Sequence, residues 1–375
     1  MADPEAGALR ARIVDIMRGP ADRPDDDAFD ALARAAFAWQ FAHNVPYAAY
    51  CRTRGRTPDT VTHWTEIPAV PAAAFKEIAL VAGRAEDAEA VFRTSGTSQG
   101  TERRGTHHVL DLSLYEASLL ASFDAWLLPD GARPVMLSLV PSREALPDSS
   151  LAWMIDCVMA RRGATGSAVL ATVRAGIDAA AFEAQLRGLA EQQQMICILG
   201  TTLSFAHALA TLRTSDDAVR LPPGSRLMDT GGSKGRTHDV EQNEMRAAYA
   251  HLLGIDPDFC VNEYGMTEML SQFYDDTLRA AAQTGAAGSR VKRPPAWVRT
   301  RVVDPDTLRP VPPGAPGLLQ HFDLANLFSV MAIQTEDIGI ADDEGFRLLG
   351  RALGAPPRGC SIAMDDLLAA ARNET

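Results

Sequence analysis

Clustered cysteines, basic runs and long apolar stretches are all missing from this chain of 375 residues. No Cys-x-x-Cys pair or Cys/His cluster occurs at the spacing of a zinc site, and the 5 cysteines are too scattered for a disulfide framework. No stretch approaches the roughly 20 uninterrupted apolar residues of a membrane helix. The arginines are dispersed, and a net charge of −12 argues against nucleic acid or an anionic membrane as the main partner. These absences predict a soluble protein of the reducing cytoplasm.

Short apolar runs and amphipathic segments alternate through most of the sequence. Periodicity predicts helices over 109–128, 150–163 and 177–194, and strands over 134–140, 195–200, 225–232 and 258–265. This alternation is typical of an α/β fold with mostly parallel sheets covered by helices. We expect an α/β core over 1–300, a small β-rich subdomain over 301–350 with Pro-Gly turns, and a short tail over 351–375.

The stretch VFRTSGTSQGT (91–101) is unusually rich in hydroxyl groups and glycine, and Arg103 and Arg104 follow it. Its residues are compatible with a plain linker, a phosphate cradle or the turn of a catalytic nucleophile. In a phosphate cradle, glycines let backbone N–H groups approach an anion, and the hydroxyls add further donors. The pattern GxxxxGK[ST] of a Walker A loop does not occur in the chain.

Two further segments follow predicted strands, where parallel sheets bind their ligands. DTGGSKGR (229–236) brings two adjacent glycines, and NEYGMTE (262–268) sets Glu263 and Glu268 around an aromatic residue. An aromatic ring that can stack on a base, next to a carboxylate that can hold Mg²⁺, suits an ATP site. Asp337, in TEDIG between two predicted strands, could accept hydrogen bonds from paired ribose hydroxyls.

The order of these segments, completed by a Gly-Arg pair, resembles the adenylate-forming superfamily of acyl-, aryl- and aminoacyl-AMP synthetases. The resemblance runs from about residue 90 to 351 and implies the fold of that superfamily's N-terminal lobe, with ATP and Mg²⁺ as cofactors. It implies that Thr94, Ser95, Gly96, Thr97 and Ser98 surround the β- and γ-phosphates. Gly231, Gly232 and Tyr264 would then frame the adenine. Thr267 and Glu268 would meet the α-phosphate and Mg²⁺, Asp337 the ribose, and Arg351 would lie at a hinge.

The segment after Arg351 indicates which family within this superfamily the chain resembles. Superfamily members usually carry a second lobe with a lysine that completes adenylation, whereas the sequence from Arg351 to Thr375 contains no lysine, so we expect a truncated C-terminal lobe. GRALGAPPRGCSIAMDDLL (350–368) and the VFRTSGT loop are similar to the acyl-protein synthetases of the LuxE type. That resemblance implies a cysteine near the C-terminus that accepts the acyl group, and Cys360 matches it. Pro356, Pro357 and Gly359 predict irregular chain there, and Arg358 would favour a thiolate.

We therefore expect an AMP-forming ligase that activates a carboxylic acid, for example a fatty acid, and transfers it to Cys360. Its partner would be an acyl-accepting reductase or carrier protein. Three alternatives stay open: transfer to a carrier-protein or coenzyme A thiol, a non-catalytic nucleotide-binding subunit, and a serine hydrolase. The hydrolase would use Ser98 or Ser233, each in a G-x-S-x-G match, with His251 or His321 as base.

Overall fold

The computed structural model describes residues 3–21, 25–95, 103–212, 218–231, 238–352 and 358–373. They form two compact units, each built from more than one stretch of chain. Unit 1 comprises residues 1–122, 266–272 and 294–375, and unit 2 comprises residues 123–265 and 273–293. The expected subdomain 301–350 and the tail 351–375 both fall within unit 1.

Unit 2 contains a mostly parallel sheet with the strand order β12-β11-β10-β9-β8-β4-β5. Strands β5, β4, β8, β9 and β10 run parallel, and β11 and β12 are antiparallel additions at one edge. The strands are β4 (Val135–Ser138), β5 (Ala168–Val169), β8 (Ile196–Thr201), β9 (Arg226–Thr230), β10 (Cys260–Tyr264), β11 (Phe273–Asp275) and β12 (Lys292–Arg293), with a separate pair β6 (Ala171–Thr172) and β7 (Gly176–Ile177). The helices are α5 (Ser150–Arg162), α6 (Ala179–Glu191), α7 (Thr202–Leu212), α8 (His238–Leu253) and α9 (Thr277–Thr284), with a 3-10 turn η4 (Pro257–Phe259).

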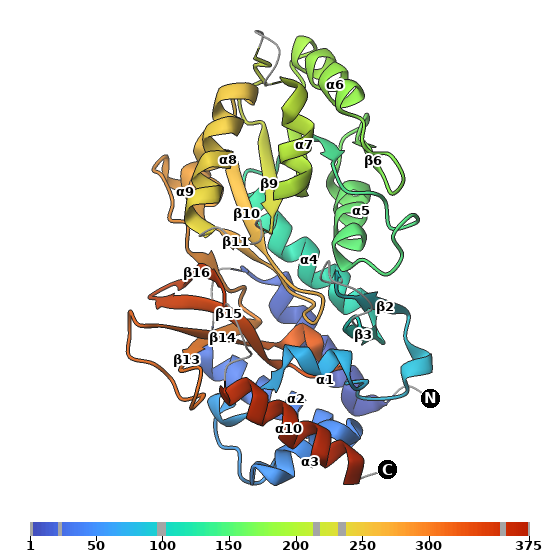
Figure 1. Ribbon diagram of the computed structural model, residues 1–375, viewed down its shortest axis with the longest axis vertical. Helices are drawn as coiled ribbons and strands as arrows, with labels where there is room; N and C mark the ends of the chain where they lie inside the picture. Colours follow the sequence, from blue (N-terminus) through green and yellow to red (C-terminus); the bar gives the residue numbers. More distant parts are fainter. Residues whose placement is uncertain are drawn as a thin grey trace. The chain divides into compact units, whose positions relative to one another are not determined.

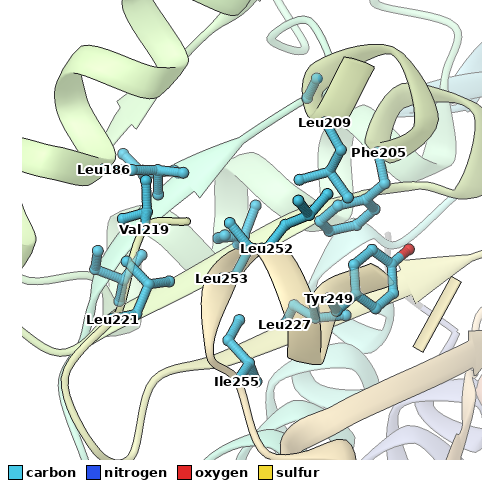
Figure 2. Close-up of a cluster of buried hydrophobic side chains, with 14 of the residues drawn as sticks. Leu186, Phe205, Leu209, Val219, Leu221, Leu227, Tyr249, Leu252, Leu253 and Ile255 are labelled. Carbon is cyan, nitrogen blue, oxygen red and sulfur yellow. The ribbon is translucent and has the colours of Figure 1, made fainter. Parts of the chain in front are cut away.

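The core of unit 2 lies between the parallel strands and helices α6, α7 and α8. Figure 2 shows its centre, where Phe205 of α7 and Tyr249 of α8 meet beside Leu227 of β9. The rings of Phe205 and Tyr249 are 5.0 Å apart, edge to face. Helices α7 and α8 lie beside β9 in Figure 1. The continuous apolar runs in the sequence are thus strands that are buried on both faces, as expected for a parallel sheet.

Unit 1 contains an antiparallel sheet, β13-β14-β15-β16, with β1 added parallel to β15. Its strands are β1 (Val70–Pro71), β13 (Val298–Val303), β14 (Pro316–Asp323), β15 (Ala332–Asp342) and β16 (Gly345–Arg351), and β2 (Ala90–Arg93) forms a separate hairpin with β3 (Thr106–Val109). Its helices are α1 (Pro4–Arg18), α2 (Asp26–His43), α3 (Val45–Thr53) and α10 (Arg358–Asn373), and α4 (Leu112–Leu127) begins in it and ends in unit 2. Short 3-10 turns are η1 (Trp64–Glu66), η2 (Ala72–Lys76), η3 (Ala85–Asp87) and η5 (Leu324–Asn326).

Local signals in the sequence explain where helix α2 of unit 1 begins and which of its faces is buried. Asp25 caps α2, since its Oδ1 accepts a hydrogen bond of 2.9 Å from the backbone N–H of Ala28. The apolar positions Phe29, Leu32 and Phe37 are all buried on one face of that helix. Helix α10 packs against α3, beside which it lies in Figure 1.

The sequence-based expectations for the fold are confirmed at most elements. The four predicted strands correspond to β4, β8, β9 and β10, and the three predicted helices to α4, α5 and α6, with ends shifted by at most three residues. The mostly parallel sheet covered by helices is present in unit 2. Across the described ranges, no helix combines the length and apolar character of a membrane span.

Candidate functional site

The hydroxyl-rich loop starts from a pair of short antiparallel strands in unit 1. Strand β2 leads into Thr94 and Ser95, and β3 returns antiparallel to β2. Thr94 closes the base of the loop: its backbone N–H donates to the carbonyl of Gly105 (3.0 Å), and its Oγ1 accepts from the Gly105 N–H (2.9 Å). Gly105 suits this position, because an added Cβ would lie 3.0 Å from Thr94 Cγ2. Gly96, Thr97 and Ser98 lie outside the described residues.

The two arginines after the loop both make contacts within unit 1. The Arg104 guanidinium donates to the backbone carbonyls of Thr94 (2.6 Å) and Arg93 (3.2 Å) and so fastens the hairpin. Arg103 forms an ion pair of 3.3 Å with Glu77. Both positive charges therefore already have partners beside the loop.

Residues 266–272 form a turn whose backbone is held by hydrogen bonds to side chains from other parts of unit 1. His107 of β3 donates from Nδ1 to the Thr267 carbonyl (2.9 Å), and Asn326 donates from Nδ2 to the Glu268 carbonyl (2.8 Å). Burial lowers the pKa of His107 to about 4, so the ring is neutral and its one ring proton sits on Nδ1 for this bond. The Leu270 N–H donates to Asn326 Oδ1 (2.9 Å). These bonds hold the backbone on both sides of Glu268 and so fix the direction of its side chain.

Glu268 is a buried carboxyl group with a strongly perturbed acidity. The residue is 8% exposed, and burial raises the pKa of its carboxyl group to about 7. The positive charges of Arg351 and Lys76 oppose the shift, while the Asp337 carboxylate adds to it. Strongly shifted carboxyl groups with named charge partners are common at functional sites. The structure thus brings Thr267, Glu268, Asp337 and Arg351 into one region of unit 1.

Asp337 lies inside a strand, which corrects the expectation that it stands between two strands. It belongs to β15 and pairs in register with Arg351 of β16. The local chain is irregular, since the register of β15 shifts against both neighbours and Thr335 Oγ1 accepts from the Asp337 N–H (3.1 Å). Such bulges redirect side chains within a sheet. Arg351 also forms an ion pair of 2.7 Å with Glu336.

Gly231 and Tyr264 belong to unit 2, at the carboxyl ends of β9 and β10. Gly231 has φ of 81°, a left-handed conformation that favours glycine, and its carbonyl accepts from Thr202 Oγ1 (3.0 Å). The Tyr264 ring is buried 5.7 Å from that of Phe273. Gly232 lies outside the described residues. Among the described residues, those expected at the adenine occupy unit 2, and those expected at the phosphates, the magnesium ion and the ribose occupy unit 1.

Sequence reasoning gave no role to the buried polar network around these strand ends. Glu263 is hydrogen-bonded to Thr230, and burial raises its pKa to about 7. The Lys292 ammonium donates to Asn262 Oδ1 (2.6 Å) and Asp275 Oδ1 (3.0 Å), fully buried. No local motif predicts the buried position of Lys292, because its hydrogen-bond partners are distant in the sequence. The same holds for His107 and Asn326 in unit 1.

The surroundings of Cys360 differ from those expected. Cys360 lies in the first turn of α10, not in irregular chain, and is 6% exposed in a cluster with Val303 and Leu318. Burial, and to a lesser extent the Glu336 carboxylate, raise its pKa to about 11. The expectation of a favoured thiolate at this position is therefore wrong for this conformation. The apolar environment outweighs any effect of nearby basic residues.

The start of α10 is fitted closely to the turn before β14. The Gly359 N–H donates to the Pro305 carbonyl (3.0 Å), and a Cβ added at Gly359 would lie 2.7 Å from that oxygen. Leu308, which packs against the Cys360 cluster, has a φ of 55°, a rare left-handed conformation for a leucine. Only glycine lets the helix approach this closely.

The residues expected of a serine hydrolase find little support. His321 is fully buried in β14, where its Nδ1 lies 2.9 Å from Thr300 Oγ1, and burial lowers its pKa to about 3. Such a ring is a poor general base near neutral pH. His251 is exposed in the last turn of α8. Ser98 and Ser233 lie outside the described residues.

The described parts of the chain contain no group of three or more His, Cys, Asp or Glu side chains arranged to hold a metal ion. A magnesium site made by protein groups alone is therefore not found there. Glu268 supplies a single carboxylate, and Mg²⁺ is commonly bound by one or two carboxylates together with substrate phosphates and water. The donor type at Glu268 fits Mg²⁺ in that mode.

Solved structures of similar fold are adenylate-forming ligases. A 2-hydroxyisobutyryl-CoA ligase in the postadenylation state, in complex with 2-HIB-AMP, matches 90% of this chain and 68% of its own, with a TM-score of 0.62 and 14% identity. The same ligase in an open conformation with 2-HIB-AMP and CoA matches 87% of this chain and 69% of its own, with a TM-score of 0.59 and 16% identity. At these identities the likeness confirms the expected fold class.

Relatives of known name cover most of the chain. A long-chain-fatty-acid–luciferin-component ligase of Vibrio harveyi is 21% identical over 355 residues, which is 90% of this chain and 88% of the relative. Its counterpart of Aliivibrio fischeri is 24% identical over 322 residues, which is 84% and 79% of the two chains. The family model "Acyl-protein synthetase, LuxE" matches residues 157–369. This match confirms the resemblance that the ordered motifs carried. Because it spans more than half of the sequence, the chain belongs to the acyl-protein synthetase (LuxE) family.

Proposed function

We propose that this protein activates a carboxylic acid with ATP and transfers the acyl group from acyl-AMP to a thiol. Family membership supports the reaction type. The single structural observation that carries the proposal is the buried Glu268 carboxyl beside Asp337 and Arg351, next to the turn of Thr267. The names of the two curated relatives make long-chain fatty acids the first substrates to test.

In the first step, a carboxylate oxygen of the acid forms a bond to the α-phosphorus, and the bond to pyrophosphate breaks. Thr267 and Glu268 are proposed to meet the α-phosphate, and Asp337 the ribose hydroxyls. Mg²⁺ held by Glu268 would neutralise negative charge on the phosphates. Such a step depends on positioning and charge neutralisation and requires no covalent protein group. The hydroxyl loop that begins at Thr94 and Ser95, with Gly96, Thr97 and Ser98, is proposed to contact the β- and γ-phosphates.

In the second step, a thiolate attacks the acyl carbonyl, a thioester forms, and AMP leaves. Cys360 is the proposed acceptor within this chain. Its proton must be lost first, and its pKa of about 11 in the described conformation opposes that loss. We therefore infer that the first turn of α10 leaves its packed position before transfer. A reductase or a carrier protein would receive the acyl group afterwards.

The burial of Cys360 also favours a second candidate acceptor. An external thiol, on a carrier protein or coenzyme A, needs no rearrangement of α10. In that case the protein forms the same acyl-AMP, and Cys360 is a structural residue of the α10 cluster.

Intact-protein mass after incubation with Mg-ATP and a panel of short, long and aromatic acids tests both candidates. A hydroxylamine-labile mass gain that matches one acid, and is absent from Cys360→Ala, supports acylation of Cys360. Release of pyrophosphate without a mass gain supports an external acceptor. If no acid gives pyrophosphate or acyl-AMP, the proposed activity is contradicted.

A further inference from the structure

The phosphates of a bound nucleotide bring several negative charges that positive groups must neutralise during transfer. Four cations of unit 1 either follow the hydroxyl loop in the sequence or act electrostatically on Glu268. Two of them, Arg103 and Arg104, flank the loop, and the other two, Arg351 and Lys76, act electrostatically on Glu268. Three of these four cations are paired with other protein groups, and one is available to bind an anion.

Three of these four cations have protein partners. Arg104 donates to two backbone carbonyls of the β2–β3 hairpin. Arg103 is paired with Glu77, and Arg351 with Glu336. By contrast, Lys76 is exposed and has no hydrogen-bond or ion-pair partner among the residues that the structure describes. An unpaired, flexible ammonium group is free to bind an anion.

Lys76 is placed at the site by a chain of direct contacts. It ends η2, which contacts both β3 and β15. Its neighbour Phe75 is buried edge-on against His107, with ring centroids 5.5 Å apart. His107 in turn donates to the carbonyl of Thr267, the residue before Glu268. The backbone of η2 is thus anchored beside the same turn that presents Glu268.

We propose that Lys76 contacts the phosphates of the bound nucleotide and neutralises the negative charge that develops as pyrophosphate leaves. This inference rests on the proposed acid activation and adds a residue to it. The ammonium keeps its protons throughout, so the bonds formed and broken remain those of the first step. A lysine suits this position because its long stem and point charge can follow a departing anion.

Substitution kinetics test the role. We expect Lys76→Gln to lower the rate of acid-dependent pyrophosphate release by about 10²-fold and to raise the KM for Mg-ATP. Lys76→Arg, which keeps the charge, should recover most of the rate. Arg84→Gln is the matched control, since Arg84 is an exposed cation paired with Glu86 and its loss changes the net charge equally. Equal rates for Lys76→Gln and Arg84→Gln would overturn the inference.

Chemical labelling tests the same contact without turnover. Pyridoxal 5′-phosphate forms an imine with accessible lysines near anion sites, and borohydride reduction fixes it for peptide mass analysis. We expect labelling of Lys76 that Mg-ATP suppresses, and little labelling of the buried Lys292. Labelling of Lys76 that is equal with and without Mg-ATP contradicts the inference. Absence of pyrophosphate for every acid, with Lys76 still protected, contradicts the proposed reaction and leaves the nucleotide contact supported.

Discussion

Glu268 shows at the scale of one residue how a functional group can weaken a fold. Burial raises the pKa of its carboxyl to about 7 from an ordinary value of 4.5. The unfolded chain ionises freely above pH 4.5, whereas the folded chain resists ionisation until about pH 7. Glu268 therefore destabilises the folded protein above pH 7, and this cost disappears as the pH falls below 4.5.

We expect Glu268→Gln to raise the unfolding free energy of the nucleotide-free protein at pH 8 by about 1–3 kcal/mol, because the cost of a buried charge is removed. The gain should vanish near pH 4. The same variant should lose about 10²-fold in pyrophosphate release. Urea unfolding at the two pH values measures the first effect, with Glu144→Gln, an exposed carboxylate, as control. A stability that is unchanged at pH 8 would disagree with the burial of this charge.

For single residues, the sequence predicts which side chains can take part in the chemistry better than it predicts their burial and their contacts. Glu268, Asp337 and Arg351 were recognisable from the order of their motifs. The neutral ring of His107 was not, because it depends on burial against Phe75 and on the carbonyl of Thr267, which lies 160 positions away. Lys76 carries no motif either.

Helix α10 decides, at the scale of elements, whether the thiol of Cys360 can react. Its first turn is held by the close contact of Gly359 with the chain before β14. Further along, Asp366 pairs with Arg54 of the segment after α3 at 2.6 Å, and the Arg54 guanidinium also lies 4.2 Å from the centre of the Tyr50 ring. Freeing Cys360 therefore requires local opening at the start of α10 while its later contacts can persist.

We predict that Gly359→Ala increases the rate at which Cys360 reacts with a thiol reagent such as Ellman's reagent by about tenfold or more. The added methyl group would lie 2.7 Å from the Pro305 carbonyl oxygen and 2.9 Å from Leu308 Cδ2, so the first turn must shift. Gly7→Ala is the control, because an added Cβ in α1 has no neighbour within 4 Å. Cys360→Ala in the same background identifies the reacting thiol. Equal labelling rates for the two alanine variants would show that Gly359 does not hold Cys360 in place.

Elements of unit 2 were predictable because period-2 and period-3.6 patterns agree there with burial. The errors fall where distant contacts override local pattern. The sequence predicts Asp337 between two strands, yet the pairing of β15 with β14 and β16 places it inside β15. Gly359 indicates irregular chain, yet it lies in the first turn of α10, where a residue without a side chain fits against Pro305. Pro356 and Pro357 lie outside the described residues.

The whole molecule carries several buried acids and bases whose pKa values are shifted in opposite directions. Burial raises the pKa of Glu263 and Glu268 to about 7 and that of Asp323 to about 6. Burial lowers the pKa of His107 to about 4 and that of His321 to about 3. The carboxyl groups cost stability as the pH rises toward 7, and the histidines cost stability as the pH falls below 6.5.

We therefore expect the unfolding free energy to fall by roughly 1 kcal/mol as the pH rises from 6.5 to 8, because in that range the folded chain binds more protons than the unfolded chain. Chemical unfolding across this range measures the trend. In the variant that combines Glu263→Gln with Glu268→Gln, the decline should flatten. A stability that rises through this range in the unmodified protein would contradict these assignments.

Asp337 and Ile338 are consecutive residues in the irregular part of β15. Ile338 packs with Cys360, whereas Asp337 acts on Glu268. The thiol is thus stored beside the same strand that carries Asp337, one of the carboxyl groups that we assign to the nucleotide. If Cys360 accepts the acyl group, the rate at which α10 opens sets how long the acyl-AMP must stay bound before transfer. Activated acids that dissociate or hydrolyse before it opens are discarded, so acid selection would depend on residence time as well as on fit.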